Sequence, residues 1–259
     1  MNFEFRTHRA HNYPRLAKRW KALARKARLR CTVFEKVDEF ELLCVRSPAL
    51  REKNGIYLSA GIHGDEPAST EGLYLWAELN APMLRDLPLI MFPCLNPWGL
   101  VGNLRLDSQG RDLNRCFHLD EPAQIRAQKA LLAPYSFRLA LCLHEDYDAQ
   151  GVYVYELSNR NRPFGPELLA AAGLYVPVDL RRTIEGRRAN QGWIARRLSA
   201  LKVPFRAESM YLAENHSDRN ITFETPSEYD LPARIHAQVA AIQRAVELTM
   251  TGAARSPAR

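Results

Sequence analysis

The sequence predicts an α/β fold, a single domain of three layers in which a mixed, mostly parallel central sheet has helices on both faces. The chain of 259 residues is 46% apolar, which is enough to bury one sizeable core. Short apolar runs of strand length alternate with helix-length segments, a pattern typical of a sheet covered by helices. No repeat, low-complexity block or linker interrupts this pattern. We therefore expect one domain over residues 1–251 and a disordered tail over residues 252–259.

The N-terminal quarter is expected to form a helix and three strands. Apolar residues recur at helical spacing over residues 13–29 and predict an amphipathic helix. Two strand-like runs, residues 31–37 and 40–47, are expected to pair as a hairpin. The run GIYLSAGI, residues 55–62, is rich in apolar and small residues and too short for a helix, which indicates a buried strand.

Helices and strands are then expected to alternate along the chain. The predicted helices are residues 67–79, 121–132, 166–172 and 230–250, and the predicted strands are residues 87–97, 137–144, 151–157, 205–212 and 220–226. A polar loop is expected between residues 97 and 117. The arginine-rich segment 175–199 shows no pattern that assigns it to a helix or a strand.

The charge of the chain limits its possible partners. It carries 36 basic and 29 acidic side chains, a net charge of +7. Eight of the basic residues lie between His11 and Arg30, and we interpret them as the solvated face of the first helix. A nucleic-acid or membrane role for this segment is the less favoured alternative. A milder consequence of the positive charge is the attraction of an anionic substrate.

Cysteine usage and hydropathy indicate the compartment. The five cysteines are odd in number, widely spaced and without a CxxC pair, so neither a disulfide framework nor a thiolate metal site is predicted. The N-terminus has no continuous apolar stretch of the kind found in signal peptides, and no segment approaches the roughly 18 apolar residues of a membrane span. We expect a soluble, cytoplasmic protein that binds neither nucleic acid nor membrane.

Three ionisable side chains, His63, His144 and Glu224, lie at the ends of predicted strands. In an α/β sheet, functional groups gather at the carboxyl ends of the strands. Glu66 follows His63 by three residues and begins the next helix, with Pro67 in the first turn, where no backbone donor is needed. Two histidines and one glutamate can hold zinc and leave a fourth position open, as catalytic sites do. The alternative for His63 and Glu66 is the polar cap of a helix.

The segment NPWGLVGNLRLDSQGRDLNRCF, residues 96–117, is a second candidate for function, because long ordered loops are often functional. HGDE, NPWG, an arginine ahead of GRDLNRCF, a strand-end LHE and a late strand glutamate occur in this order. With them the chain resembles the M14 zinc carboxypeptidase family and its relatives, the murein peptide amidases and the succinylglutamate desuccinylase/aspartoacylase deacylases. The resemblance covers about residues 56–226 and implies a zinc carboxypeptidase-like fold.

The resemblance implies a metal site. His63, Glu66 and His144 match the three ligands of one Zn²⁺ ion. Asp112, in DLNR, matches the residue that orients the first histidine through its other ring nitrogen, which fixes the tautomer and raises the basicity of the ligand.

The resemblance also implies the groups that act on the substrate. Asn114 and Arg115 match the pair that binds a substrate carboxylate, where a planar guanidinium forms two parallel hydrogen bonds. Arg105 matches the arginine that stabilises the developing oxyanion, with Arg111 as the neighbouring alternative. Glu224, in NITFETP, matches the general base. The other candidates for that role are Glu214 and Glu228.

The sequence departs from the family pattern at two positions. The usual NPDG is NPWG here, so Trp98 replaces an acidic residue, and Cys116 stands where NRNF has its second asparagine. Tyr211 is a candidate for a tyrosine that covers the substrate, although its spacing to Glu224 is short. The segment Arg181–Arg188 is interpreted as a solvated loop, with binding of an acidic group as the less favoured alternative.

The expected activity follows from these matches. We predict a zinc-dependent metallopeptidase of the carboxypeptidase type, which hydrolyses an amide bond next to a free carboxylate in a small peptide. The alternative substrate is an N-acyl amino acid, cleaved by a deacylase with the same zinc core, and Arg105 favours the peptidase. The alternative of another class is a basic nucleic-acid or anion-binding module that uses the first helix.

Overall fold

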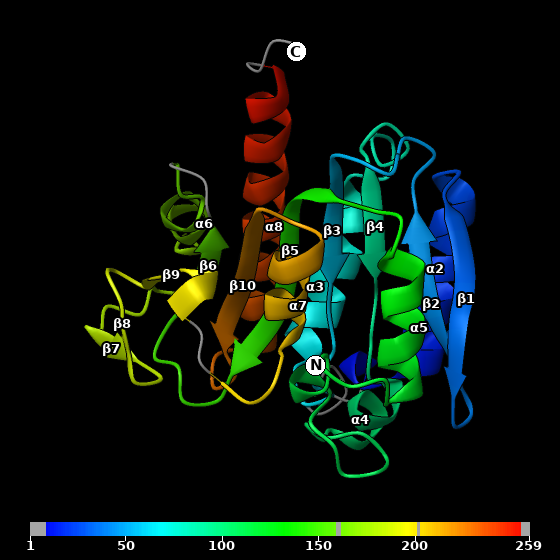
Figure 1. Cartoon of the computed structure of the whole chain (residues 1–259), viewed down its shortest axis with the longest axis horizontal. Coiled ribbons are helices and arrows are strands. Elements are labelled where there is room, and N and C mark those ends of the chain that lie inside the picture. The colour runs from blue at the N-terminus through cyan, green and yellow to red at the C-terminus, as the bar shows by residue number, and fades with distance from the viewer. Residues whose placement is uncertain (1–8, 159–161, 201–202, 255–259) are drawn as a thin grey trace.

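An eight-stranded mixed sheet runs through the protein in the order β1-β2-β4-β3-β5-β10-β6-β9 (Figure 1). The computed structural model describes residues 9–158, 162–200 and 203–254. The strands are β1 Arg30–Val37, β2 Phe40–Arg46, β3 Gly55–Ser59, β4 Leu89–Phe92, β5 Phe137–Asp146, β6 Tyr153–Ser158, β9 Trp193–Arg196 and β10 Arg219–Pro226. The four central strands, β4, β3, β5 and β10, are mutually parallel, and antiparallel pairs flank them. The predicted mixed, mostly parallel sheet is confirmed.

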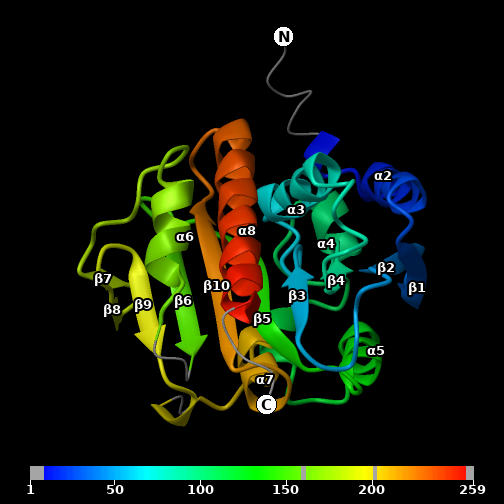
Figure 2. The same ribbon diagram turned by 90° about the horizontal axis from the view of Figure 1, so that it is seen from above.

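Helices cover both faces of the sheet, as predicted. Figure 2 shows α2, α3, α6 and α8 on one side and α5 and α7 on the other. The helices are α2 Tyr13–Lys26, α3 Pro67–Leu79, α4 Pro97–Gly102, α5 Ala123–Leu132, α6 Gly165–Ala172, α7 Glu208–Asn215 and α8 Leu231–Ala254. Within the described residues, no helix is both long and apolar enough to cross a membrane.

The alternation of side chains along the strands builds a separate core under each helical layer. In β3, Ile56 and Leu58 enter the core formed with α2, α3, α6 and α8, whereas Tyr57 enters the core formed with α5 and α7. All three side chains are fully buried. The continuous apolar run in the sequence therefore reflects a strand that is covered on both faces.

The expected strand over residues 205–212 is wrong, because this segment contains the start of helix α7. The spacing of Met210 and Leu212 suggests a strand, but the helix is fixed at its N-terminus by distant groups. The Glu208 amide donates to the Asn114 side-chain carbonyl at 2.9 Å, and the buried Glu208 carboxylate accepts from the Ser59 hydroxyl at 2.9 Å. These tertiary contacts outweigh a local pattern of only eight residues.

Other departures are smaller. Helix α4 lies inside the predicted polar loop, where Pro97 takes the first position and Asn96 caps the helix by accepting from the Gly99 amide. The unassigned segment contains β9 and a small hairpin of β7, Thr183–Ile184, and β8, Arg187–Arg188. Short 3₁₀ turns lie at Leu113–Arg115 and Leu198–Ala200. Helix α8 continues to Ala254, into the expected tail, and residues 255–259 lie outside the described part of the chain.

Candidate active site

The carboxyl ends of three adjacent parallel strands, β3, β5 and β10, meet at one cavity of about 820 Å³. His144 and Glu224 lie opposite each other in the register of β5 and β10, so their side chains share one face of the sheet. His63 reaches the same place from the turn after β3. Seven of the eight predicted site residues line this cavity, and the eighth, Asp112, contacts His63.

The turn between β3 and α3 explains the small residues around His63. Gly61 has a φ of 62°, in the left-handed region that favours glycine. Gly64 has a different function: a Cβ there would lie 1.9 Å from the carbonyl carbon of Gly99. The Gly64 amide also donates to the Leu104 carbonyl at 3.1 Å. The glycine in HGDE is therefore needed because the turn packs closely against α4.

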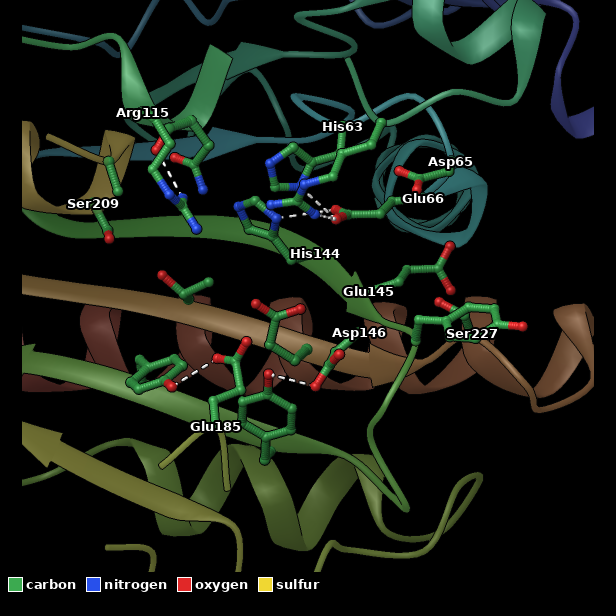
Figure 3. Close-up of a pocket in the computed structure, with 18 of the residues that line it drawn as sticks. His63, Asp65, Glu66, Arg115, His144, Glu145, Asp146, Glu185, Ser209 and Ser227 are labelled. Atoms are coloured by element: carbon green, nitrogen blue, oxygen red, sulfur yellow. Dashed lines mark hydrogen bonds and ion pairs between the residues drawn. The ribbon is translucent and has the colours of Figure 1, made fainter. Parts of the chain in front are cut away.

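His63, Glu66 and His144, which we call the histidine–glutamate cluster, converge on one point (Figure 3). Nδ1 of His63 lies 2.5 Å from Oε1 of Glu66, and Nδ1 of His144 lies 3.0 Å from Oε2. The three side chains are each 3% exposed. Oε2 of Glu66 accepts no aligned hydrogen bond within the described residues. Two imidazole nitrogens and an incompletely bonded buried carboxylate form a donor set that suits a divalent metal ion.

The electrostatics of the cluster show a carboxylate that is kept ionised. Burial alone would raise the pKa of Glu66, but the adjacent His63 and His144 lower it to about 2. Burial would lower the pKa of His63, but Glu66 and Asp112 outweigh it and raise this pKa to about 9. The pKa of His144 is also raised, because Glu66 and Glu224 outweigh the effect of burial. The buried Glu66 carboxylate thus requires positive charge beside it.

Asp112 holds His63 from the other side of the ring. Its Oδ1 lies 3.2 Å from Nε2 of His63 and accepts from the Asn114 amide at 2.9 Å. Its Oδ2 accepts from Nε and Nη2 of Arg105, at 3.2 and 3.1 Å. Burial would raise the pKa of Asp112, but His63 and Arg105 lower it strongly. An ionised Asp112 leaves Nδ1 of His63 facing Glu66, the arrangement expected for an oriented metal ligand.

Arg105, and not Arg111, lies at the cluster. Nη1 of Arg105 is 3.8 Å from Oε1 of Glu66, and its guanidinium lines the cavity. Arg111 is held outside the cavity lining by an ion pair of 2.7 Å with Asp107. Of the two arginines that the sequence offered, the structure thus places only Arg105 beside Glu66.

Asn114 and Arg115 present donors to the cavity. The side-chain carbonyl of Asn114 already accepts from the Glu208 amide, so its NH₂ group is the part that remains available. The Arg115 guanidinium lies 4.6 Å from the ring centre of Phe205, and its Nη1 donates to the Asn114 backbone carbonyl. No carboxylate in the described part of the chain lies within ion-pair distance of Arg115. The pair is thus able to accept an external carboxylate.

Glu224 is the only one of the three glutamate candidates that lines the cavity. Its side chain is 9% exposed, and Oε2 has no hydrogen-bond partner among the described residues. Burial raises the pKa of Glu224 well above its ordinary value, although His144 opposes this. Glu214 instead pairs with Arg206 at 2.8 Å, and Glu228 is exposed. A buried carboxylate with a raised pKa is suited to accept and return a proton.

Glu145 is a residue of the site that the sequence left unassigned. It follows His144, and its carboxylate accepts from the Ala68 amide at 2.6 Å, at the start of the helix that carries Glu66. It also pairs with Arg234 of α8. Burial raises its pKa to about 7 despite this arginine. Only an acidic residue beside a histidine is visible in the sequence, because Arg234 lies 89 residues away.

Two tyrosines of β6 support further carboxylates in the cavity. The Tyr153 hydroxyl donates to Asp146 at 2.9 Å, and the Tyr155 hydroxyl donates to Glu185 at 2.7 Å. Figure 3 shows these two hydrogen bonds below the cluster. Glu185 comes from the turn of the β7–β8 hairpin, a segment without a sequence pattern.

The remaining sequence candidates lie elsewhere. Tyr211 is not among the residues that line the cavity, and its ring packs 5.7 Å from Phe117 and 5.3 Å from His216. The suggestion that it covers the substrate is therefore not supported. Trp98 packs against the larger core. Cys116 donates through its thiol to the Asp112 backbone carbonyl at 3.2 Å, so this departure leaves the DLNR turn intact.

Comparison with known proteins agrees with this arrangement. The family model of the succinylglutamate desuccinylase/aspartoacylase catalytic domain matches residues 52–247. No curated protein sequence matches the chain.

Solved structures share the fold. A proposed metallopeptidase from Shewanella amazonensis has a TM-score of 0.81 and 23% identity, over 92% of this chain and 94% of its own. One from Shewanella denitrificans has a TM-score of 0.80 and 23% identity, over 91% and 89%. A metallo-carboxypeptidase from Burkholderia cenocepacia has a TM-score of 0.66 and 16% identity, over 91% and 68%. These likenesses show a carboxypeptidase-like α/β fold.

Proposed function

Because the chain belongs to the succinylglutamate desuccinylase/aspartoacylase catalytic-domain family, and so to a superfamily of hydrolases, we propose that it is a zinc-dependent metallopeptidase of the carboxypeptidase type. It hydrolyses an amide bond next to a free carboxylate in a small peptide. One observation carries the proposal: the histidine–glutamate cluster, Arg115 and Glu224 line the same cavity, and among the described residues Arg115 has no ion-pair partner and Oε2 of Glu224 has no hydrogen-bond partner. A metal site, a carboxylate site and a proton acceptor are the parts that this reaction needs.

His63, Glu66 and His144 are the residues that hold the metal in this proposal. The fit rests on the convergence of their donor atoms, which lie within 4.8 Å of one another, and on the ionised Glu66 carboxylate. When bound, zinc supplies an acidified water and a Lewis acid for the amide carbonyl. Three ligands leave the open position that such chemistry requires.

Glu224 and Arg105 act on the reacting atoms. Glu224 takes the proton of the attacking water and returns it to the leaving amine, a role that its raised pKa favours. Its Oε2 has no hydrogen-bond partner among the described residues. Arg105 stays charged beside Asp112 and stabilises the negative oxygen that develops from the carbonyl. Such a preorganised donor is typically worth about 3 kcal/mol in the transition state.

Asn114 and Arg115 position the substrate. A carboxylate on the guanidinium of Arg115 and the NH₂ group of Asn114 fixes the neighbouring amide beside the cluster, so that binding energy supplies orientation. The α7 helix supports this pair from behind, because the Glu208 amide holds the carbonyl of Asn114.

The second candidate is deacylation of an N-acyl amino acid, which the matching family model favours. Both reactions use the same metal and carboxylate groups. They differ in the group that donates the carbonyl of the scissile amide, which is an amino-acid residue in a peptide and an acyl group in an N-acyl amino acid.

A hydrolysis assay with metal analysis tests the proposal. The purified protein is analysed for metal and offered peptides with free C-termini, the same peptides amidated, cell-wall tripeptides and N-acyl amino acids. We expect close to one zinc per chain and hydrolysis of peptides with a free C-terminus, with loss of at least about tenfold on amidation because Arg115 then has no carboxylate to bind. Equal rates for the free and amidated peptides would contradict the role of Arg115, and exclusive cleavage of N-acyl amino acids would favour the deacylase.

A further inference from the structure

The cavity carries opposite charge on the two sides of the histidine–glutamate cluster. Figure 3 shows Arg115 and Ser209 on one side of the cluster and Asp65 and Glu145 on the other. Strand β5 runs past the cluster from His144 to Asp146, so Asp146 lies beyond His144 along the strand. All of these residues line the cavity. A substrate that spans the cluster therefore meets a cationic end and an acidic end.

Asp65 and Asp146 give the acidic end its charge. The Asp146 carboxylate accepts only from neutral donors, the Tyr153 hydroxyl at 2.9 Å and the Asp148 amide at 2.9 Å. Within the described ranges, no lysine, arginine or histidine lies within ion-pair distance of Asp65 or Asp146. Glu145 differs from them, because Arg234 neutralises it. Within the described residues, Arg105 and Arg181 act on these carboxylates only from beyond ion-pair distance, so both carboxylates remain to attract a positive group.

The other charged residues of the cavity lining do not cancel this pattern. Arg196 of β9 lies opposite Leu157, which pairs with Asn220 near the start of β10, whereas Asp146 pairs with Pro226 at the end of that strand, so Arg196 belongs to the cationic side. Arg105 is bound to Asp112, and it lies between the two ends at the cluster. The β7–β8 hairpin contributes one charge of each sign to the lining, Glu185 and Arg187. Between the ends, Oε2 of Glu224 has no hydrogen-bond partner in the described part of the chain, and the side chain is more than nine-tenths buried, which independently indicates that a polar occupant belongs in the cavity.

We propose that the substrate is a short zwitterionic peptide with a free α-amino group. Its carboxylate lies on Arg115, its scissile amide lies at the cluster, and its ammonium group lies at Asp65 and Asp146. A cavity of about 820 Å³ suits a small ligand, of di- or tripeptide size. The inference rests on the proposed function, and it discriminates between the two substrate classes: a dicarboxylic acyl group would bring a negative charge to the acidic end, which like-charge repulsion disfavours.

Kinetics with matched probes give the first test. A set of di- and tripeptides with free C-termini is offered with a free N-terminus, N-acetylated and N-succinylated. We expect kcat/KM to be at least about tenfold higher for the free amine than for the acetylated peptide, and lowest for the succinylated one. Equal or higher values for the acylated peptides overturn the proposal. This comparison uses the wild-type protein and needs no variant.

Variants test whether Asp65 and Asp146 cause the preference for a free amino group. The double variant Asp65→Asn/Asp146→Asn is expected to lose about tenfold in kcat/KM for the free peptide and to leave the acetylated peptide almost unchanged. Asp86→Asn, at an exposed position far from the cavity lining, is the matched control and keeps the wild-type preference. An equal loss for both peptides contradicts the proposal, because a general defect of the site does not depend on the charge of the amine.

Calorimetry measures the preference for a free amino group through binding alone, independently of hydrolysis. The zinc-loaded Glu224→Gln variant is titrated with alanyl-alanine and with its N-acetyl form. Tighter binding of the free dipeptide, by about tenfold, supports the acidic end, and equal or weaker binding overturns it. Absence of hydrolysis of every probe by the wild-type protein would count against the proposed function alone, since the binding comparison does not depend on turnover.

Discussion

The two halves of the candidate site differ in how completely their polar groups are bonded. On the cluster half, His63 is held between Glu66 and Asp112, and Asp112 in turn is held by Arg105. The exception is Oε2 of Glu66, which accepts no aligned hydrogen bond within the described residues and lies among the converging donor atoms. On the substrate half, Arg115 faces no carboxylate and Oε2 of Glu224 accepts no hydrogen bond within the described residues. Both halves line the same cavity, so exposure to solvent does not explain the difference.

The difference indicates which groups the protein must position and which ones it leaves for an external partner. Ligands of a metal need fixed orientation, and hydrogen bonds to their far atoms supply it. A carboxylate-binding arginine or a proton acceptor must instead keep its bonding capacity until the substrate arrives. A buried carboxylate oxygen without a hydrogen-bond partner among the described residues is unfavourable for folding, and burial also raises the pKa of Glu224.

The largest effect is expected at the cluster half. His63→Ala removes one of three converging donors and leaves Glu66 with less positive charge nearby, so metal binding should weaken by more than about 100-fold and hydrolysis should fall to background. Metal content by mass spectrometry and an activity assay measure both. His118→Ala, at an exposed position, is the control. Stoichiometric zinc in His63→Ala would show that the cluster is not the metal site.

The next largest effect is expected at Glu224, and it separates the two halves. Glu224→Gln keeps the shape of the side chain but removes its ability to take a proton. We expect about a 1,000-fold loss of kcat with unchanged metal content, because a positioned general base contributes about 10²–10⁴-fold. Glu228→Gln, at an exposed position just after β10, is the control. A Glu224→Gln variant with full activity would refute the role of this residue.

A third, smaller effect is expected at Arg115. Arg115→Met removes the guanidinium and keeps much of the apolar stem, so KM for peptides with a free C-terminus should rise by about 100-fold while kcat changes less. Amidated peptides, which offer no carboxylate, should be affected far less. Arg51→Met tests for general effects of losing a surface charge. An equal loss for both kinds of peptide would contradict carboxylate binding by Arg115.

The proximity of His63, Glu66 and His144 could be predicted from the sequence because these residues follow the local pattern of the fold. His63 and His144 end apolar strands, and Glu66 begins a helix with proline in its first turn, so strand order and turn chemistry were visible from the residues alone. The parallel sheet then brings them together. Asp112, Asn114 and Arg115 were assigned through the family resemblance, and their positions agree with it.

Sequence analysis failed where long-range contacts decide the structure. Helix α7 resembled a strand because its N-terminal anchors, Asn114 and Ser59, lie more than 90 residues away. The β7–β8 hairpin, which brings Glu185 to the cavity, has two-residue strands that carry no periodicity. Glu185 also has a φ of 45°, where glycine or asparagine is more usual, so turn rules did not indicate it.

The smallest effect is expected at Glu145, behind the cluster. It tests whether the ion pair of Glu145 with Arg234 positions Glu66 or only stabilises the fold. Glu145→Gln still accepts from the Ala68 amide but leaves Arg234, 11% exposed, without its carboxylate, so the free energy of unfolding should fall by about 2 kcal/mol. The double variant Glu145→Gln/Arg234→Met should recover about half of this loss, since removing both charges costs less than removing one. Urea denaturation measures stability, and metal affinity is measured in parallel. If the double variant regains stability but still binds metal about tenfold more weakly than the wild type, Glu145 positions Glu66 through α3. If stability and metal affinity both recover fully, the ion pair serves only to stabilise the fold.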